Sequence, residues 1–140
     1  MPKAKIIFLI ILFMLAFSGC ISDSQVKIEL LLISTDINIT NVEVTYSSLY
    51  SEPKNVTINL KTNDQRLGLS TSKSDNFKQS VTINEEVGSG YINSKRIYVK
   101  IIDSSIPPGN YKITATIEAE KSDYLTKPVE DEIIVSIGSS

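Results

Sequence analysis

The chain of 140 residues has a formal net charge of −2, one cysteine, no histidine and no tryptophan. Its first nineteen residues hold two lysines and no acidic residue, which leaves 12 basic and 16 acidic residues, a net charge of −4, from residue 20 onward. This balance argues against a nucleic-acid partner, which needs clustered lysine and arginine, and the missing histidine removes the commonest general base and transition-metal ligand.

The first part of the chain has the pattern of a secretion signal. Lys3 and Lys5 precede an unbroken apolar run over residues 6–17, which is shorter than the roughly 20 residues that a spanning helix needs. A basic start, an apolar segment of this length and small residues before a cleavage point are typical of a signal peptide. We therefore expect a hydrophobic signal helix in residues 1–19, with an uncleaved N-terminal anchor as the alternative.

After a short tether over residues 20–25, apolar and polar residues alternate with a period of two, which predicts β-strands. The clearest examples are Val26, Ile28 and Leu30, then Val56, Ile58 and Leu60, and then Ile97, Val99 and Ile101. The apolar run 31–33 extends the first strand and is expected to be buried. Ile39 and Val42 have opposite phases, so a turn or bulge is expected at Thr40 and Asn41.

The last third of the chain has the strongest alternation. Five apolar residues from Tyr111 to Ala119 alternate with polar ones, and Ile133, Val135 and Ile137 form a final strand. Seven or eight strands at this spacing, with no helical periodicity after Cys20, predict an all-β antiparallel sandwich over residues 26–138. A jelly roll or an open barrel remains an alternative.

No pattern in the chain indicates catalysis. A serine nucleophile would lack a histidine base, and the paired carboxylates of glycosidase chemistry have only weak candidates. These candidates are Glu85 with Glu86, Glu118 with Glu120, and the run Glu130, Asp131 and Glu132. Charge on an exposed strand face explains most of them, so we expect no catalytic residue, no cofactor and no enzyme activity.

A calcium site would need several oxygen ligands from neighbouring loops. Asp103, Asp123 and Asp131 are the only candidates near expected loop ends, and they lack the spacing of a calcium-binding loop. We therefore expect no metal site. Two glycosylation sequons occur, at Asn38 and at Asn55, and both lie in or beside expected strands.

The end of the prefix, Phe17-Ser18-Gly19-Cys20, resembles the lipobox of prokaryotic lipoproteins, although Phe17 stands where leucine is commonest. The resemblance implies that the Cys20 thiol receives a diacylglyceryl group and that Cys20 becomes the first residue of the mature protein. Two acyl chains anchor a protein stably, whereas one binds only marginally. The passage around Cys20 also looks like surface lipoproteins of methanogenic archaea. An incidental cysteine at an ordinary cleavage site is the alternative.

At Pro107-Pro108-Gly109-Asn110-Tyr111 the chain resembles the immunoglobulin-like or fibronectin type III-like domains of prokaryotic surface proteins. The resemblance covers roughly residues 26–137. It implies a tyrosine corner, in which the Tyr111 hydroxyl bonds to backbone upstream and has a structural role. Antibody-type domains are excluded, because the chain lacks their two intersheet cysteines and core tryptophan.

These observations predict an extracytoplasmic lipoprotein, anchored to the cell membrane through Cys20, whose domain contacts another envelope or membrane protein. The loops over residues 70–76 and 104–110, or an exposed edge strand, are the expected contact surfaces. The alternative is a small-ligand or carbohydrate-binding accessory lipoprotein. That function would need several of the remaining tyrosines to share one exposed face; they are Tyr46, Tyr50, Tyr91, Tyr98 and Tyr124.

Overall fold

The structure, a computed structural model, describes residues 25–35, 39–74, 76–120 and 128–138. The described residues form eight strands: β1 (Val26–Thr35), β2 (Ile39–Ser48), β3 (Lys54–Thr62), β4 (Leu67–Ser70), β5 (Ser80–Val87), β6 (Ile92–Ile101), β7 (Gly109–Ala119) and β8 (Val129–Ile137). They contain no helix long and apolar enough to cross a membrane. The expected signal helix over residues 1–19 lies outside the described residues.

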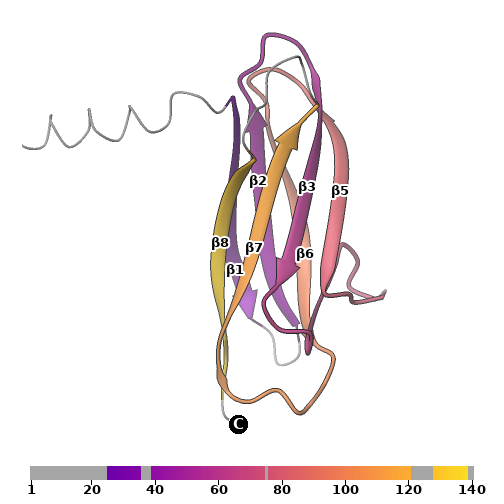
Figure 1. The fold of residues 1–140 in the computed structure, drawn as a ribbon, viewed down its shortest axis with the longest axis vertical. Coiled ribbons are helices and arrows are strands. Elements are labelled where there is room, and N and C mark those ends of the chain that lie inside the picture. Colours follow the sequence, from indigo (N-terminus) through magenta and orange to yellow (C-terminus); the bar gives the residue numbers. More distant parts are fainter. Residues whose placement is uncertain (1–24, 36–38, 75, 121–127, 139–140) are drawn as a thin grey trace, which may run out of the picture.

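The eight strands form two antiparallel sheets of four strands each, packed face to face (Figure 1). The first sheet has the order β1-β2-β6-β4, and the second has the order β5-β3-β7-β8. This order corresponds to the two sheets of an immunoglobulin-like sandwich, with β5 added beside β3. The prediction of an all-β antiparallel sandwich is confirmed.

The strand directions define two ends of the sandwich. β1 begins at the upper end in Figure 1, which we call the N-terminal end. The β2–β3 connection and the β5–β6 turn lie at this same end, because Ser47 pairs with Ile92 and Ser48 bridges to Ser89. The β3–β4 turn and the β6–β7 connection lie at the opposite end, which we call the far end.

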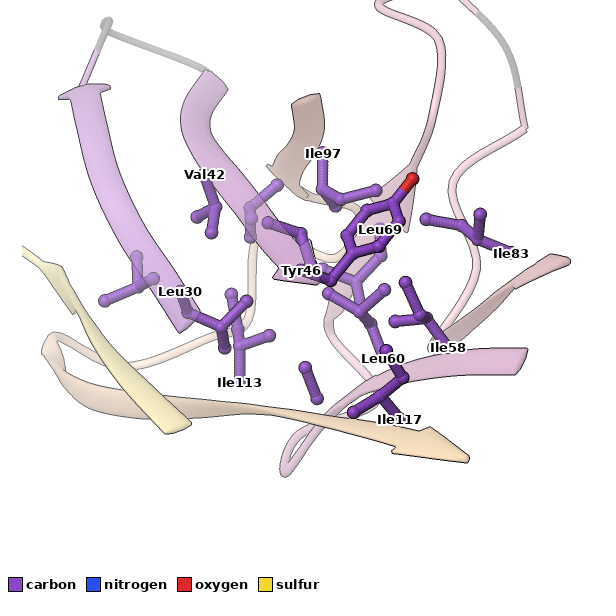
Figure 2. Packing of buried hydrophobic residues seen from close by; sticks show 14 of the residues in the cluster. Leu30, Val42, Tyr46, Ile58, Leu60, Leu69, Ile83, Ile97, Ile113 and Ile117 are labelled. Carbon is purple, nitrogen blue, oxygen red and sulfur yellow. The ribbon is translucent and has the colours of Figure 1, made fainter. Parts of the chain in front are cut away.

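The core consists of apolar side chains that both sheets contribute. Every second residue of β7 is buried from Tyr111 to Ala119, and the residues between them are half-buried or exposed. Figure 2 shows Ile113 and Ile117 of β7 in one cluster with Val42 and Ile97 of the first sheet. Such alternation follows because each sheet has one face in the core and one face in water.

Ile58 tests how much this core contributes to stability. Its side chain is 0% exposed, and it pairs with Ile83 on one side and Ile117 on the other. The Ile58→Ala variant should lose about 3 kcal/mol of unfolding free energy in urea titrations, through lost burial and a residual cavity. The control, Ile134→Ala on the exposed face of β8, should lose less than about 1 kcal/mol. Equal losses would contradict this assignment of the core.

The predicted burial of residues 31–33 is wrong. Leu31, Leu32 and Ile33 are all exposed. Leu31 and Ile33 alternate with buried Leu30, so their side chains point to the outer face of the first sheet. β1 is the edge strand of this sheet, and no described strand covers its outer face. The register with β2 also shifts between Leu32 and Ser34, which marks a bulge at this end of β1.

The predicted turn or bulge at Thr40 and Asn41 is also wrong. β2 runs unbroken from Ile39 to Ser48, and it is Thr40 that occupies an inward, buried position. Ile39 is half-buried, and its side chain points to the opposite face of β2 from Thr40. The phase difference between Ile39 and Val42 therefore reflects a small polar residue at an inward position, because the strand itself does not bend there.

Candidate functional site

The flank of the sandwich between β5 and β6 is only partly covered by strands. β4 pairs with the last four residues of β6, from Tyr98 to Ile101. Residues 92–97 pair with β2 on one side and with no described strand on the other. We call this segment the free β6 edge. Unpaired N–H and C=O groups along such an edge can bind an extended segment of another chain, so it is a candidate contact site.

Three polar side chains lie behind the free β6 edge. The Tyr46 hydroxyl donates a hydrogen bond to the Glu85 carboxylate, and Lys95 Nζ lies 3.6 Å from Oε1 of Glu85. Glu85 points inward because it shares its phase with Ile83 and Val87 on β5. Figure 2 shows the Tyr46 ring inside the core cluster, with its hydroxyl oxygen at the margin. Glu85 thus gives the buried phenol a hydrogen-bond partner, and Lys95 balances the carboxylate charge.

Of the predicted carboxylate pairs, Glu85 and Glu86 point to opposite faces of β5, and the other glutamates are exposed at the outer surface. Glu86 follows the inward-facing Glu85 and is exposed on the outer face of β5. Glu118 and Glu120 are exposed at the end of β7, and Glu130 and Glu132 are exposed on β8. The cluster of Tyr46, Glu85 and Lys95 contains a single carboxylate. It can therefore close this flank of the sandwich, but it cannot supply the two opposed carboxylates that glycosidase chemistry needs.

The opposite flank is closed by a partly buried carboxylate contact. Asp131 of β8 points toward β1, and its Oδ2 accepts a hydrogen bond from the backbone N–H of Leu30 at 2.8 Å. An inward-pointing charge is one of the devices that prevent strand addition at a sheet edge. Both flanks thus carry an inward-pointing charge beside a sheet edge, Asp131 next to β1 and Lys95 on β6, and residues 92–97 have no second partner among the described strands.

The far end is held together by an arginine–aspartate contact. Arg66 Nε and Nη2 donate to the two carboxylate oxygens of Asp64 at 2.9 and 2.6 Å. The Arg66 carbonyl accepts a hydrogen bond from the Ile102 N–H at 2.9 Å, which joins the β3–β4 turn to the β6–β7 connection. The Arg66 side chain, and then its backbone N–H, lower the pKa of Asp64 from 3.8 to about 2.

This contact predicts an acid-dependent contribution to stability. Because the pKa of Asp64 is lower when folded, its contribution is present above pH 3.8 and is lost as the pH falls toward about 2. The Asp64→Asn variant should be less stable than the wild type at neutral pH, and the difference should shrink as the pH falls through about 2 in thermal unfolding. Glu130→Gln, on the exposed face of β8, is the control. A difference that is constant with pH would contradict the prediction.

The two predicted site residues that the structure describes, Tyr111 and Asn55, lie at opposite ends of the sandwich. The Tyr111 hydroxyl donates to the Pro107 carbonyl at 2.5 Å, which is the geometry of a tyrosine corner. Asn55 is exposed on β3, where its Nδ2 donates to Glu120 Oε2 at 3.1 Å. Cys20 and Asn38 lie outside the described residues.

The described tyrosines do not gather on one face. Tyr46 is buried, and Tyr50 packs partly against the core. Tyr91 is exposed in the β5–β6 turn, whereas Tyr98 is half-buried on the outer face of the first sheet. Tyr124 lies outside the described residues. Among the described tyrosines, therefore, no three share one exposed face.

The two described candidate calcium ligands, Asp103 and Asp131, lie apart. Asp103 lies at the far end, where the backbone N–H of Ser105 lowers its pKa, and Asp131 faces β1. Asp123 lies outside the described residues. In the part of the chain that the structure describes, no three or more acidic or cysteine side chains form a group that could hold a metal ion.

Comparison with known proteins supports the assignment of the fold but gives no information about the candidate site. No family model and no curated protein matches the chain. A family 123 glycoside hydrolase from Clostridium perfringens is similar in structure, with a TM-score of 0.50 and 10% identity. The match covers 84% of this chain but only 28% of the hydrolase chain. At this identity the similarity shows a shared β-sandwich fold and nothing of the activity.

Two smaller proteins are similar over most of their length. The GAE domain of GGA2p from Saccharomyces cerevisiae has a TM-score of 0.40 and 14% identity, covering 81% of this chain and 90% of that domain. BslA, described as a bacterial hydrophobin, has a TM-score of 0.38 and 14% identity, covering 82% of this chain and 95% of its own.

Proposed function

We propose that the chain is a prokaryotic cell-envelope lipoprotein that presents a non-catalytic immunoglobulin-like domain for protein contact outside the cytoplasmic membrane. The basic and apolar prefix that ends in Ser18-Gly19-Cys20 supports a lipid anchor on Cys20. Residues 21–25 can span roughly 17 Å when extended, so the domain stays close to the bilayer that holds the lipid.

The observation that carries the contact role is the free β6 edge. Among the described strands, residues 92–97 pair with β2 alone, and the side chains of Ser94 and Arg96 are exposed beside the edge. An extended segment of a partner can join the first sheet here as a further strand, with main-chain hydrogen bonds for affinity and side-chain contacts for specificity. The partner is therefore an envelope or membrane protein with an extended segment within reach of the bilayer.

The described residues give less support to the other functions. A carbohydrate-binding accessory role would need converging exposed aromatic rings, and the described tyrosines lie at different places in the sandwich. An enzyme would need converging acid–base groups in a shared site. Glu85 and Glu86 point to opposite faces of β5, and Glu118, Glu130 and Glu132 are exposed on the outer face of the second sheet, where charge is expected. The structural similarity to a glycoside hydrolase covers only 28% of that enzyme.

Site-specific photocrosslinking in native membranes tests the contact role. A photoreactive phenylalanine analogue is placed at Ser94, on the free β6 edge, or at the exposed Glu118 on the central strand β7 as the matched control. Irradiation should give one dominant protein adduct from the Ser94 position and none from the Glu118 position. The absence of an adduct at Ser94, or the same adducts from both positions, would contradict strand addition at this edge.

A further inference from the structure

Three exposed apolar side chains lie together at the N-terminal end. Ile92, Tyr91 and Leu49 are 76%, 71% and 58% exposed, more than any other large hydrophobic residue that the structure describes. They are neighbours because Gly90 N donates to the Ser48 carbonyl at 2.9 Å and Ile92 is the first residue of β6. We call these three residues the apolar tip. Exposing them to water is unfavourable, so a covering surface would stabilise this end.

The apolar tip adjoins the point at which the tether enters the domain. The backbone N–H of Leu49 donates to the carbonyl of Gln25 at 2.7 Å, and Gln25 is the first described residue of the chain. Gln25 is the fifth residue after Cys20, so the cysteine lies within roughly 17 Å of this end. A lipid on Cys20 would bring the bilayer surface to the same end of the sandwich as the apolar tip.

The turn holds the Tyr91 ring in place. A Cβ atom on Gly88 would lie 2.9 Å from Cδ2 of Tyr91, which shows that the ring packs directly against this glycine. The Tyr91 N–H also donates to the Gly88 carbonyl at 3.3 Å, and Gly90 has a φ of 75°, a conformation that favours glycine. The tip is therefore presented in a fixed arrangement, and little ordering is needed when it meets a surface.

The charges near the tip favour an apolar contact over an electrostatic one. Lys54 Nζ lies 3.4 Å from Glu52 and 5.5 Å from the centre of the Tyr50 ring, so this lysine is already partnered. The exposed Lys27 lies in the same row of the first sheet as Ile92, because both pair with Ser47. The chain from residue 20 onward has a net charge of −4, which anionic lipid would repel. Tyrosine and aliphatic side chains instead suit the boundary between headgroups and acyl chains.

We propose that the apolar tip inserts into the surface of the bilayer that holds the Cys20 lipid, so that the sandwich stands on the membrane with its N-terminal end down. This inference rests on the proposed lipid anchor. The tip and the lipid then form two attachment points, which fix the tilt of the domain as well as its distance from the membrane. The free β6 edge would rise directly from the membrane surface, because Ile92 belongs to the tip and residues 93–97 follow it away from this end.

The lack of any native tryptophan allows a direct test. The full chain carrying Tyr91→Trp is purified from membranes and reconstituted in vesicles of phosphatidylcholine and phosphatidylglycerol with brominated acyl chains, which quench tryptophan at close range. Ser105→Trp, exposed in the β6–β7 connection at the far end, is the matched control. Ile92→Trp is a second reporter at the tip, in case Tyr91→Trp disturbs the packing on Gly88. Sedimentation of the same vesicles reports whether the chain is anchored.

The expected result is co-sedimentation of all variants, a loss of at least about half of the Tyr91→Trp emission, and unchanged Ser105→Trp emission. The quenching should persist in high salt, because the contact is apolar. If the chain co-sediments but the emission of Tyr91→Trp and Ile92→Trp is quenched no more than that of Ser105→Trp, the tip does not insert. The proposed lipid anchor is then retained. If the chain remains in the supernatant, the anchor is wrong and the inference that rests on it is overturned as well.

Discussion

The Cys20→Ala variant is expected to leave the membrane fraction and appear in the soluble fraction. Each buried methylene of an acyl chain contributes about 0.8 kcal/mol, and two chains hold a protein stably where one binds only marginally. A variant without lipid would keep only the apolar tip, whose three side chains cannot replace two acyl chains. Ultracentrifugation of broken cells, followed by detection of the chain in both fractions, measures the change.

The control for this experiment is Ser22→Ala, which alters the tether and leaves the cysteine in place. It should stay in the membrane fraction like the wild type. If Cys20→Ala also sediments fully with membranes, the apolar run 6–17 acts as an uncleaved anchor and the lipoprotein hypothesis fails. The intact mass separates these outcomes, because an uncleaved chain retains residues 1–19 and a lipidated chain has lost them.

Alternation along single strands is the part of the fold that the sequence could predict. The burial of β7 follows residue by residue from the alternation between Tyr111 and Ala119, because a strand with one face in water leaves that pattern. The exposure of Leu31 and Ile33 could not be predicted in this way. An apolar run shows that residues are hydrophobic, but whether a neighbouring strand covers them depends on their place at the edge of a sheet.

The candidate contact site was less accessible to prediction, because its parts are distant in the sequence. The Tyr46 to Glu85 hydrogen bond joins residues 39 positions apart, and no local motif marks it. One signal was present: Glu85 lies in phase with Ile83 and Val87, which places its carboxylate on the inward face. No sequence pattern predicted the free β6 edge, since residues 92–97 lack a second partner because β4 is short.

Gly68 is expected to be the position in the short strand β4 at which a substitution lowers stability most. β4 determines how long the free β6 edge is, because residues 98–101 of β6 pair with it. A Cβ atom at Gly68 would lie 2.6 Å from Cβ of Phe77 and 2.9 Å from Cγ2 of Ile102. The Phe77 Cβ cannot rotate away, because the adjoining Lys78 exchanges backbone hydrogen bonds with Leu69 at 2.6 and 3.0 Å. Gly68→Ala should therefore shift the backbone and lower the unfolding free energy by about 3 kcal/mol in urea titrations.

The matched control is Gly138→Ala, where an added Cβ would meet no atom within 4 Å, and its stability should equal that of the wild type. The two variants should also differ in amide hydrogen exchange. If Gly68→Ala loosens β4, the amides of Tyr98 and Lys100 on β6 should exchange faster, because β4 is their second strand partner. The free β6 edge would then extend beyond residue 97. Equal stability and equal exchange in the two variants would show that β4 is not what limits the edge.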